Sequence, residues 1–197
     1  MISWIRGRVP ALLFALVAPA TAMAQKPTAP DTLTAEERAM ASRLAEAAVA
    51  PLRTGAPMYL VASELIRPKG EEARQALVTH YRYDGDLAIL TTVDFGRGQV
   101  VSLDTVPHLV VPIVQEEVDR ARELALADPR VSRAVEAWRS ELRVEAIQSR
   151  SASEADPLFG HRVVRLLFRV SRGWLDDPVV HVDLTAGRVL VEEGRPQ

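Results

Sequence analysis

Three side chains near the C-terminal end of the sequence have the chemistry of a metal site. His181 and Asp183 are two residues apart in VVHVDL, so on a β-strand they would face the same side. His161 opens the apolar run HRVVRLLFRVS, which is expected to form a neighbouring strand. Imidazole and carboxylate together suit zinc or copper. The pattern predicts a candidate metal site of His161, His181 and Asp183; the alternative is a polar row on the surface of a sheet.

A tryptophan is the candidate residue for binding a partner. Trp174 lies in RGWLDDP, where Gly173 and the nearby proline predict a loop. An exposed tryptophan beside a glycine is suited to anchoring another protein. The alternative is a ring folded back over the sheet. Trp138 differs, because it falls on one helical face with Val131 and Val135 and is expected in the core.

Other catalytic arrangements are not found in the sequence. The chain has no cysteine, and no serine lies in a Gly-x-Ser-x-Gly motif. The GRG at 96–98 joins two expected strands, whereas a phosphate loop joins a strand to a helix. The adjacent glutamates 36–37 and 116–117 diverge on a helix and suit helix starts. His108, beside a proline, is expected to be solvated. We therefore expect no enzymatic activity.

The first 24 residues have the features of a secretory signal. Arg6 and Arg8 precede an apolar run over 9–18, and Ala22 and Ala24 form a small-x-small cleavage site. The apolar run is too short to span a membrane, although a permanent anchor is the alternative. We expect cleavage after Ala24 and a periplasmic or secreted protein. A chain without cysteine fits a bacterial periplasm, where its core alone must hold the fold.

The charge balance excludes one class of partner. The signal holds two of the 24 basic residues and none of the 26 acidic ones, so the mature chain would have a net charge of −4. Charges of both signs are mixed along the chain. Binding to a phosphate backbone needs clustered lysine and arginine, so a nucleic-acid partner is not expected. A strongly anionic membrane would also be a poor partner.

Helix and strand signals alternate along the chain. Residues 25–33 are a polar, proline-rich lead-in, and Thr34 with Glu37 forms a capping box for a helix over 35–50. Its apolar stripe is expected at Met40, Leu44, Ala47 and Ala48. Asp128 and a following proline predict a second cap, after a helix over 113–127. The expected strands cover 58–66, 74–83, 87–95, 99–105, 142–148, 161–171, 179–184 and 188–192.

Two segments of the chain are nearly the same. TTVDFGRGQVVSLD (91–104) and VVHVDLTAGRVLVEE (179–193) both have Val-Asp before a turn, then glycine and an apolar strand. In each, the aspartate is placed to bond the backbone of its own turn. The repeat predicts an α+β protein of two units, 34–106 and 107–193, each a helix packed on an antiparallel sheet of about four strands. Two unrelated hairpins that obey the same turn rules are the alternative.

The block THYRYDGDLAILTTVDFGRGQVVSLDTVPHLVVPIVQEEVDRARELALADPRVSRAV resembles the third N-terminal domain of copper amine oxidases. Upstream, LTAEERAMASRLAEAAVAPLRTGAPMYLVASELIRPK is similar to the preceding domain of those enzymes. The resemblance covers roughly residues 33–140. It implies two cystatin-like α+β units. A copper cofactor is implied only by this resemblance.

The catalytic parts of that family are missing from the sequence. Its copper and topaquinone belong to a large C-terminal β-sandwich, for which a chain of 197 residues has no room. In THYRYD (79–84), Arg82 stands where the quinone motif needs asparagine, and no His-x-His pair exists. We therefore expect a non-catalytic exported module that binds another envelope protein. A periplasmic carrier of a small ligand or copper is the alternative, and an amine-oxidase label would rest on family resemblance alone.

Overall fold

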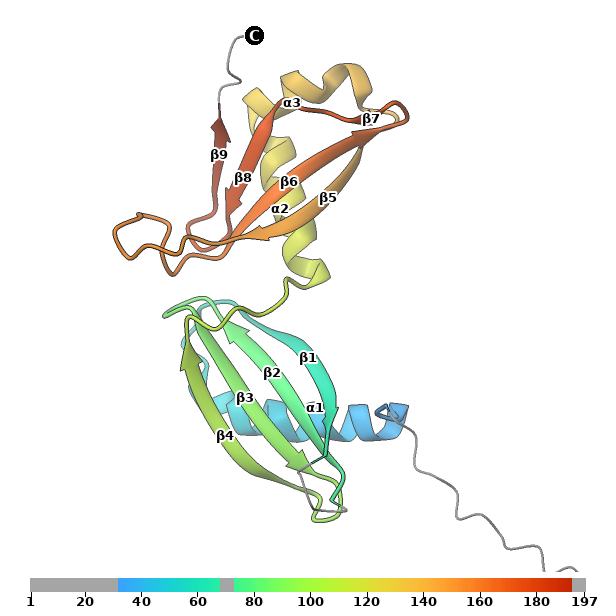
Figure 1. The fold of residues 1–197 in the computed structure, drawn as a ribbon, viewed down its shortest axis with the longest axis vertical. Helices are drawn as coiled ribbons and strands as arrows, with labels where there is room; N and C mark the ends of the chain where they lie inside the picture. The colour runs from blue at the N-terminus through green and yellow to red at the C-terminus, as the bar shows by residue number, and fades with distance from the viewer. Residues whose placement is uncertain (1–31, 68–72, 193–197) are drawn as a thin grey trace, which may run out of the picture.

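The computed structural model describes residues 32–67 and 73–192, which form two helix-and-sheet layers placed end to end (Figure 1). The predicted signal, residues 1–24, lies outside the described residues, as does most of the lead-in. The described end of the lead-in is not a free segment, because Leu33 is buried in the first core. None of the helices in the described residues is long and apolar enough to cross a membrane.

The first helix begins as the sequence predicts. Helix α1 covers Ala35–Val49. The Thr34 hydroxyl accepts from the Glu37 N–H at 3.2 Å, and the Glu37 carboxylate accepts from the Thr34 N–H at 2.8 Å, which confirms the capping box. The predicted apolar stripe is right for Leu44, which packs against the core, but the centre of the buried face lies one residue later along the helix. The most buried residues of α1 are Ala41, Ala45 and Val49, whereas Ala47 is exposed. The small side chains of Ala41 and Ala45 let the helix backbone approach the sheet.

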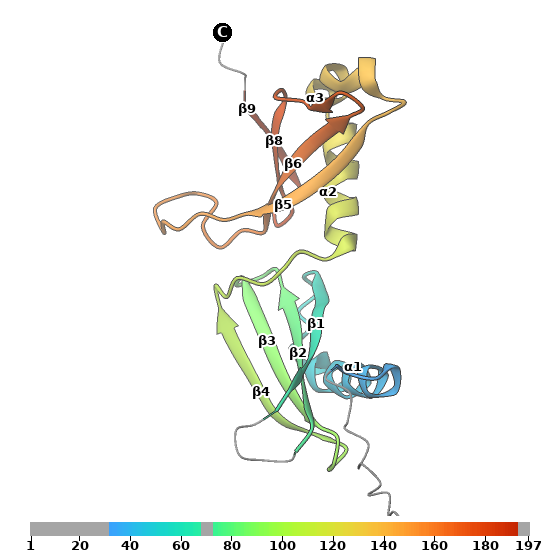
Figure 2. The same ribbon diagram turned by 45° about the vertical axis from the view of Figure 1, so that its right-hand side comes forward.

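The first sheet is an antiparallel meander in chain order. Its strands are β1 (Met58–Ile66), β2 (Gln75–Arg82), β3 (Leu87–Asp94) and β4 (Gln99–Pro107). Helix α1 crosses one face of all four strands, with a 3-10 turn, η1 (Ala50–Leu52), at its end. Ala76, Val78 and Val93 meet the helix there and form a small core. The opposite face of this sheet has no helix on it (Figures 1 and 2).

The second layer repeats this plan with two additions, a second helix and a short fifth strand. Two helices, α2 (Gln115–Ala127) and α3 (Pro129–Val135), precede the 3-10 turn η2 (Glu136–Trp138). The strands are β5 (Arg143–Ser149), β6 (Val163–Val170), β7 (Gly173–Trp174), β8 (Val179–Asp183) and β9 (Arg188–Glu192). Their order is β5-β6-β8-β9, and β7 pairs with the end of β6. Helix α2 packs across β5, β6, β8 and β9.

These elements confirm the α+β class, and the predicted ends of helices and strands agree with the structure to within two residues where both exist. The boundary predicted between residues 106 and 107 falls at the end of β4. The cystatin-like assignment of each unit stays a prediction. Trp138 was expected in the core, but it is only partly buried because helix α3 ends at Val135. The Arg172 guanidinium lies 5.9 Å from the centroid of its ring.

The two repeated hairpins are built alike. Oδ1 of Asp94 accepts from the Arg97 N–H at 2.9 Å, and Oδ1 of Asp183 accepts from the Ala186 N–H at 3.0 Å. The glycine that ends each turn, Gly98 or Gly187, has φ of 65°, a conformation that other residues rarely adopt. The aspartate therefore bonds its own turn in both hairpins, as the sequence predicts.

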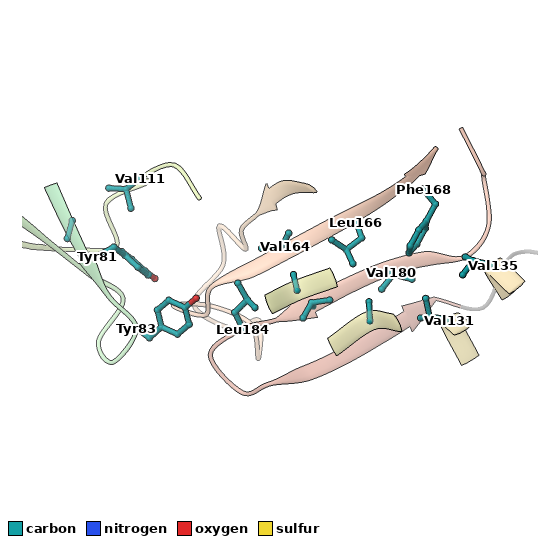
Figure 3. Packing of buried hydrophobic residues seen from close by; sticks show 14 residues of the cluster. Tyr81, Tyr83, Val111, Val131, Val135, Val164, Leu166, Phe168, Val180 and Leu184 are labelled. Atoms are coloured by element: carbon teal, nitrogen blue, oxygen red, sulfur yellow. The ribbon is translucent and has the colours of Figure 1, made fainter. Parts of the chain in front are cut away.

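The larger core joins the two layers. Its centre lies between α2 and the second sheet, where Val164, Leu166 and Phe168 of β6 are buried. The same cluster includes Tyr81 and Tyr83 at the end of the first sheet (Figure 3). The first unit therefore contributes side chains to the core of the second.

Candidate functional site

Two of the three predicted metal-binding residues are in contact. His161 lies just before β6 and Asp183 ends β8, and Nδ1 of His161 is 2.9 Å from Oδ2 of Asp183. The same oxygen accepts from Nη2 of Arg188 at 3.1 Å. Asp183 has no exposed surface, and its other oxygen bonds the turn. A guanidinium on this carboxylate opposes the binding of a cation, so Asp183 serves here as the anchor of the β8–β9 turn.

The third predicted residue lies apart from this pair. His181 is on β8, and its Nδ1 is 3.6 Å from Oε1 of Glu192 at the end of β9. Across residues 32–67 and 73–192, no group of three histidine, cysteine, aspartate or glutamate side chains is placed to hold a metal ion. The described residues therefore do not fit a copper centre, which needs at least three such donors.

Asp183 makes stability depend on pH. Burial raises the pKa of its carboxyl, but the bonds from His161, the Ala186 N–H and Arg188 outweigh burial and lower the pKa below its ordinary value of 3.8. The ionised carboxylate therefore stabilises the fold above pH 3.8, and this contribution is lost as the pH falls through the lowered value.

Replacing Asp183 with asparagine tests this role. We expect Asp183→Asn to lower the free energy of unfolding by about 1–3 kcal/mol at pH 7, because the imidazole and guanidinium lose their charged acceptor. The loss should shrink as the pH falls below 3.8, because the carboxyl of the unfolded chain then takes up a proton before that of the folded protein does. Urea unfolding between pH 3 and pH 7 measures it, with exposed Glu192→Gln as control. A loss of the same size at every pH would contradict it.

Trp174 lies on a strand, not in the predicted loop. Gly173 and Trp174 form β7, which pairs with Val170 and Arg169 of β6. The chain can return this tightly because Gly173 has φ of 131°, where a side chain would be strained. Trp174 is 51% exposed, and the Cζ atom of Arg169 lies 5.8 Å from its ring centroid. The indole therefore has a cation within cation–π distance, and half of its side chain is open to solvent.

Trp174 shares its face of the sheet with other arginines. Helix α2 covers the opposite face, and no helix covers this one (Figures 1 and 2). Register places Arg143 opposite Arg169, Glu145 opposite Leu167, and Ile147 opposite Arg165. We call this open face, with Arg143, Arg165, Leu167, Arg169 and Trp174, the Trp174 surface.

Two hollows lie on either side of the indole. The first, of about 760 Å³, is lined by residues 140–143, 169–171, Gly173 and Trp174. The second, of about 290 Å³, is lined by residues 165–167, 174–176, Pro178 and Val179. The first hollow contains Arg143 and Arg169, and the second contains Arg165. Arg143 and Arg165 have no carboxylate of the described residues at ion-pair distance. The Trp174 surface therefore presents two available guanidinium groups.

A third pocket, near His181, is lined by the end of β5 and the loop after it, by the start of β6 and by β8 and β9. It has a volume of about 380 Å³ and includes Arg130, Arg150 and Glu192. Its charged groups already have partners: Arg130 pairs with Asp128, and His181 faces Glu192. This pocket is a candidate site for a small polar ligand.

A buried ion pair near the end of the first sheet was not predicted from the sequence. Glu117, expected only to favour the start of a helix, has no exposed surface. It accepts from Nε and Nη2 of Arg162 at 2.8 and 2.9 Å, and from the Tyr83 hydroxyl at 2.9 Å. Arg162 also donates to the carbonyls of Val111 and Pro112, at 2.9 and 2.6 Å. Burial, and then the Glu117 carboxylate, raise the pKa of Tyr83.

A second buried carboxylate joins the units beside this pair. Asp86, 1% exposed, accepts from the Tyr81 hydroxyl at 2.6 Å, from Nδ1 of His108 at 3.0 Å and from Arg150 of the second unit. His108 is therefore bonded rather than merely solvated, and its ring lies 4.8 Å from that of Phe159. We call Tyr81, Tyr83, Asp86, His108, Glu117, Arg150 and Arg162 the junction network.

The signal for the junction network is weak in the sequence. Glu117 occupies the third position of α2 and accepts from the Val114 N–H at 2.9 Å, which is what a helix-start glutamate does. Its second partner, Arg162, is 45 residues away. The one indication in the sequence was an arginine at the start of an apolar strand.

Among known proteins, the chain is similar to solved structures. No family model and no curated protein matches the chain. The copper-containing benzylamine oxidase from Hansenula polymorpha is similar in structure, with a TM-score of 0.56 and 12% identity. The match covers 82% of this chain and 29% of that chain. It shows that an α+β fold of this kind occurs within a copper amine oxidase, and the chain spans less than a third of that enzyme's length.

Proposed function

We propose that this chain is a non-catalytic exported binding module, related to the N-terminal cystatin-like domains of copper amine oxidases, and that it contacts an envelope protein through the Trp174 surface. The fold similarity to a benzylamine oxidase supports the relation. The motif resemblance over residues 33–140 supports it independently. The missing quinone motif supports a role without catalysis.

The observation that carries the proposal is the setting of Trp174. The indole is half exposed, the Arg169 guanidinium lies within cation–π distance of it, and it lines two hollows. Tryptophan and arginine are the residue types that most often dominate binding energy in protein interfaces. An indole held on a short strand loses little conformational entropy on binding.

Capture of the partner tests the proposal. The tagged full chain is used to capture proteins from an extract of its own host, beside Trp174→Ala and the control Val110→Ala, which removes a 68% exposed side chain on the connector. We expect a recurrent partner whose affinity falls about thirtyfold with Trp174→Ala and is unchanged with Val110→Ala. Capture that is indifferent to Trp174, or oxidation of benzylamine by the purified chain with copper, would overturn the proposal.

A carrier of a small polar ligand is the second candidate; for a copper carrier, the described residues provide no group of three donors. The 380 Å³ pocket that includes His181 favours it, because it offers polar groups and apolar walls together. Titration with copper, comparing the native chain with the His161→Ala/His181→Ala double variant, tests the metal form. Unchanged affinity in the double variant removes these histidines from consideration.

A further inference from the structure

We propose that the Trp174 surface binds an extended acidic segment of its partner, in which two carboxylates pair with Arg143 and Arg165 and an apolar side chain between them packs on Leu167, beside the indole. This inference rests on the proposed function and adds the chemistry of the partner. It commits to a protein segment, because an open sheet face with alternating side chains matches the two-residue period of an extended chain.

The two arginines are available for such a partner. Arg169, which is opposite Arg143 on the same face, already has Glu145 at 3.6 Å and the indole within cation–π distance. In the first hollow, Glu141 accepts from the N–H and hydroxyl of Ser171. Arg143 and Arg165 are exposed and have no charged partner in the part of the chain that the structure describes. A guanidinium forms paired, charge-assisted bonds with a carboxylate, which favours an anionic group at each position.

The spacing of the arginines fixes the pattern of the partner. Arg143 lies opposite Arg169, and Arg165 is four residues from Arg169 along β6. At about 3.3 Å per residue and about 4.8 Å between strands, the two Cα atoms are roughly 14 Å apart. An extended segment covers roughly 13 Å in four residues. Its side chains at positions 1, 3 and 5 face one side, so the expected pattern is acidic-x-apolar-x-acidic.

The negative charge of Asp176 allows a substitution that should strengthen binding of an acidic segment rather than weaken it. It lines the second hollow with Arg165 and Trp174, on the connector between β7 and β8. Its charge repels an acidic segment and would attract a basic one. Removing that charge should therefore strengthen the binding of an acidic segment.

A labelled peptide is the probe. Fluorescence anisotropy follows binding of fluorescein-GSETLTESG to the full chain, with GSQTLTQSG as the neutral peptide. We expect tighter binding of the acidic peptide, a loss of about five- to tenfold for each of Arg143→Ala and Arg165→Ala, and a larger loss for Trp174→Ala. Asp176→Asn should tighten binding about two- to threefold, and added salt should weaken it. Arg97→Ala, an exposed arginine on the first sheet, is the matched control.

The outcomes separate this inference from the proposed function. Equal affinity for both peptides, indifference to Arg143 and Arg165, no peptide binding, or weaker binding with Asp176→Asn would each overturn the acidic partner. If the captured partner still depends on Trp174 in that case, the binding module stands and its partner has another chemistry. If neither the partner nor the peptide depends on Trp174, both proposals fail. Circular dichroism of each variant shows that it is folded.

Discussion

Replacing Arg162 with alanine lowers the free energy of unfolding by about 3–5 kcal/mol, the largest effect that we expect from a single change in this chain. The substitution leaves Glu117 as a charge with no exposed surface, and it removes the donor to two connector carbonyls. It also removes a guanidinium that lies 4.4 Å from the Tyr81 ring centroid. The melting temperature should fall by roughly 10 °C, at about 2–4 °C per kcal/mol for a chain of this size.

Urea unfolding, followed by circular dichroism, measures this loss. Glu116→Ala is the matched control, because Glu116 is the exposed neighbour of Glu117 on the same helix turn, and its loss should stay within about 1 kcal/mol. The double variant Arg162→Met/Glu117→Leu should be more stable than Arg162→Ala, since it leaves no buried charge unpaired. A loss under 1 kcal/mol for Arg162→Ala would show that water or another group replaces the guanidinium.

Replacing Asp86 has the second largest expected effect. Asp86→Ala leaves the buried Tyr81 hydroxyl without its acceptor and frees Arg150 and His108, which should cost about 3 kcal/mol. Asp86 also has φ of 45°, a conformation that alanine disfavours. Asp86→Gly separates the two causes. It loses the same bonds but accepts the backbone angle, so it should be about 1 kcal/mol more stable than Asp86→Ala.

Proteolysis gives this prediction a local measurement. Arg150 begins the long loop between β5 and β6, and its guanidinium bonds both Asp86 and the Leu109 carbonyl. Without Asp86, limited trypsin digestion should cut after Arg150 earlier than in the native chain. Asp84→Ala, in the same turn but partly exposed and bonded to Thr54 and Arg82 rather than to Arg150, serves for comparison. Equal cleavage of Asp86→Ala and native protein would show that this loop is held by other contacts.

The sequence predicts well the features that depend on neighbours along the chain. The capping box at Thr34 and Glu37 and the turns after Asp94 and Asp183 are each set by residues three apart. Strand and helix ends follow because glycine, proline and cap residues act within one turn of themselves. Trp174 shows the limit of this local information, because its short strand depends on pairing with Arg169.

The rest of the candidate sites depends on contacts between distant residues. Glu117 obeys the rule for a helix start and at the same time forms the buried centre of the junction with Arg162, so its local role conceals its distant one. His161 and Asp183 meet because β6 and β8 are neighbours, whereas the ring of His181 faces Glu192. Spacing on one strand indicates which side chains share a face, but not which neighbours they meet.

The junction network can form only after the second unit has been synthesised. Translation proceeds from the N-terminus, so β1 to β4 are complete before Arg162 has been made. Until then Tyr81 and Tyr83 lack the side chains that bury them, and the finished first sheet ends in two tyrosines facing water. The first unit therefore exposes an apolar, aggregation-prone surface until the second unit folds over it. The solubility of the nascent chain depends on how soon the second unit folds.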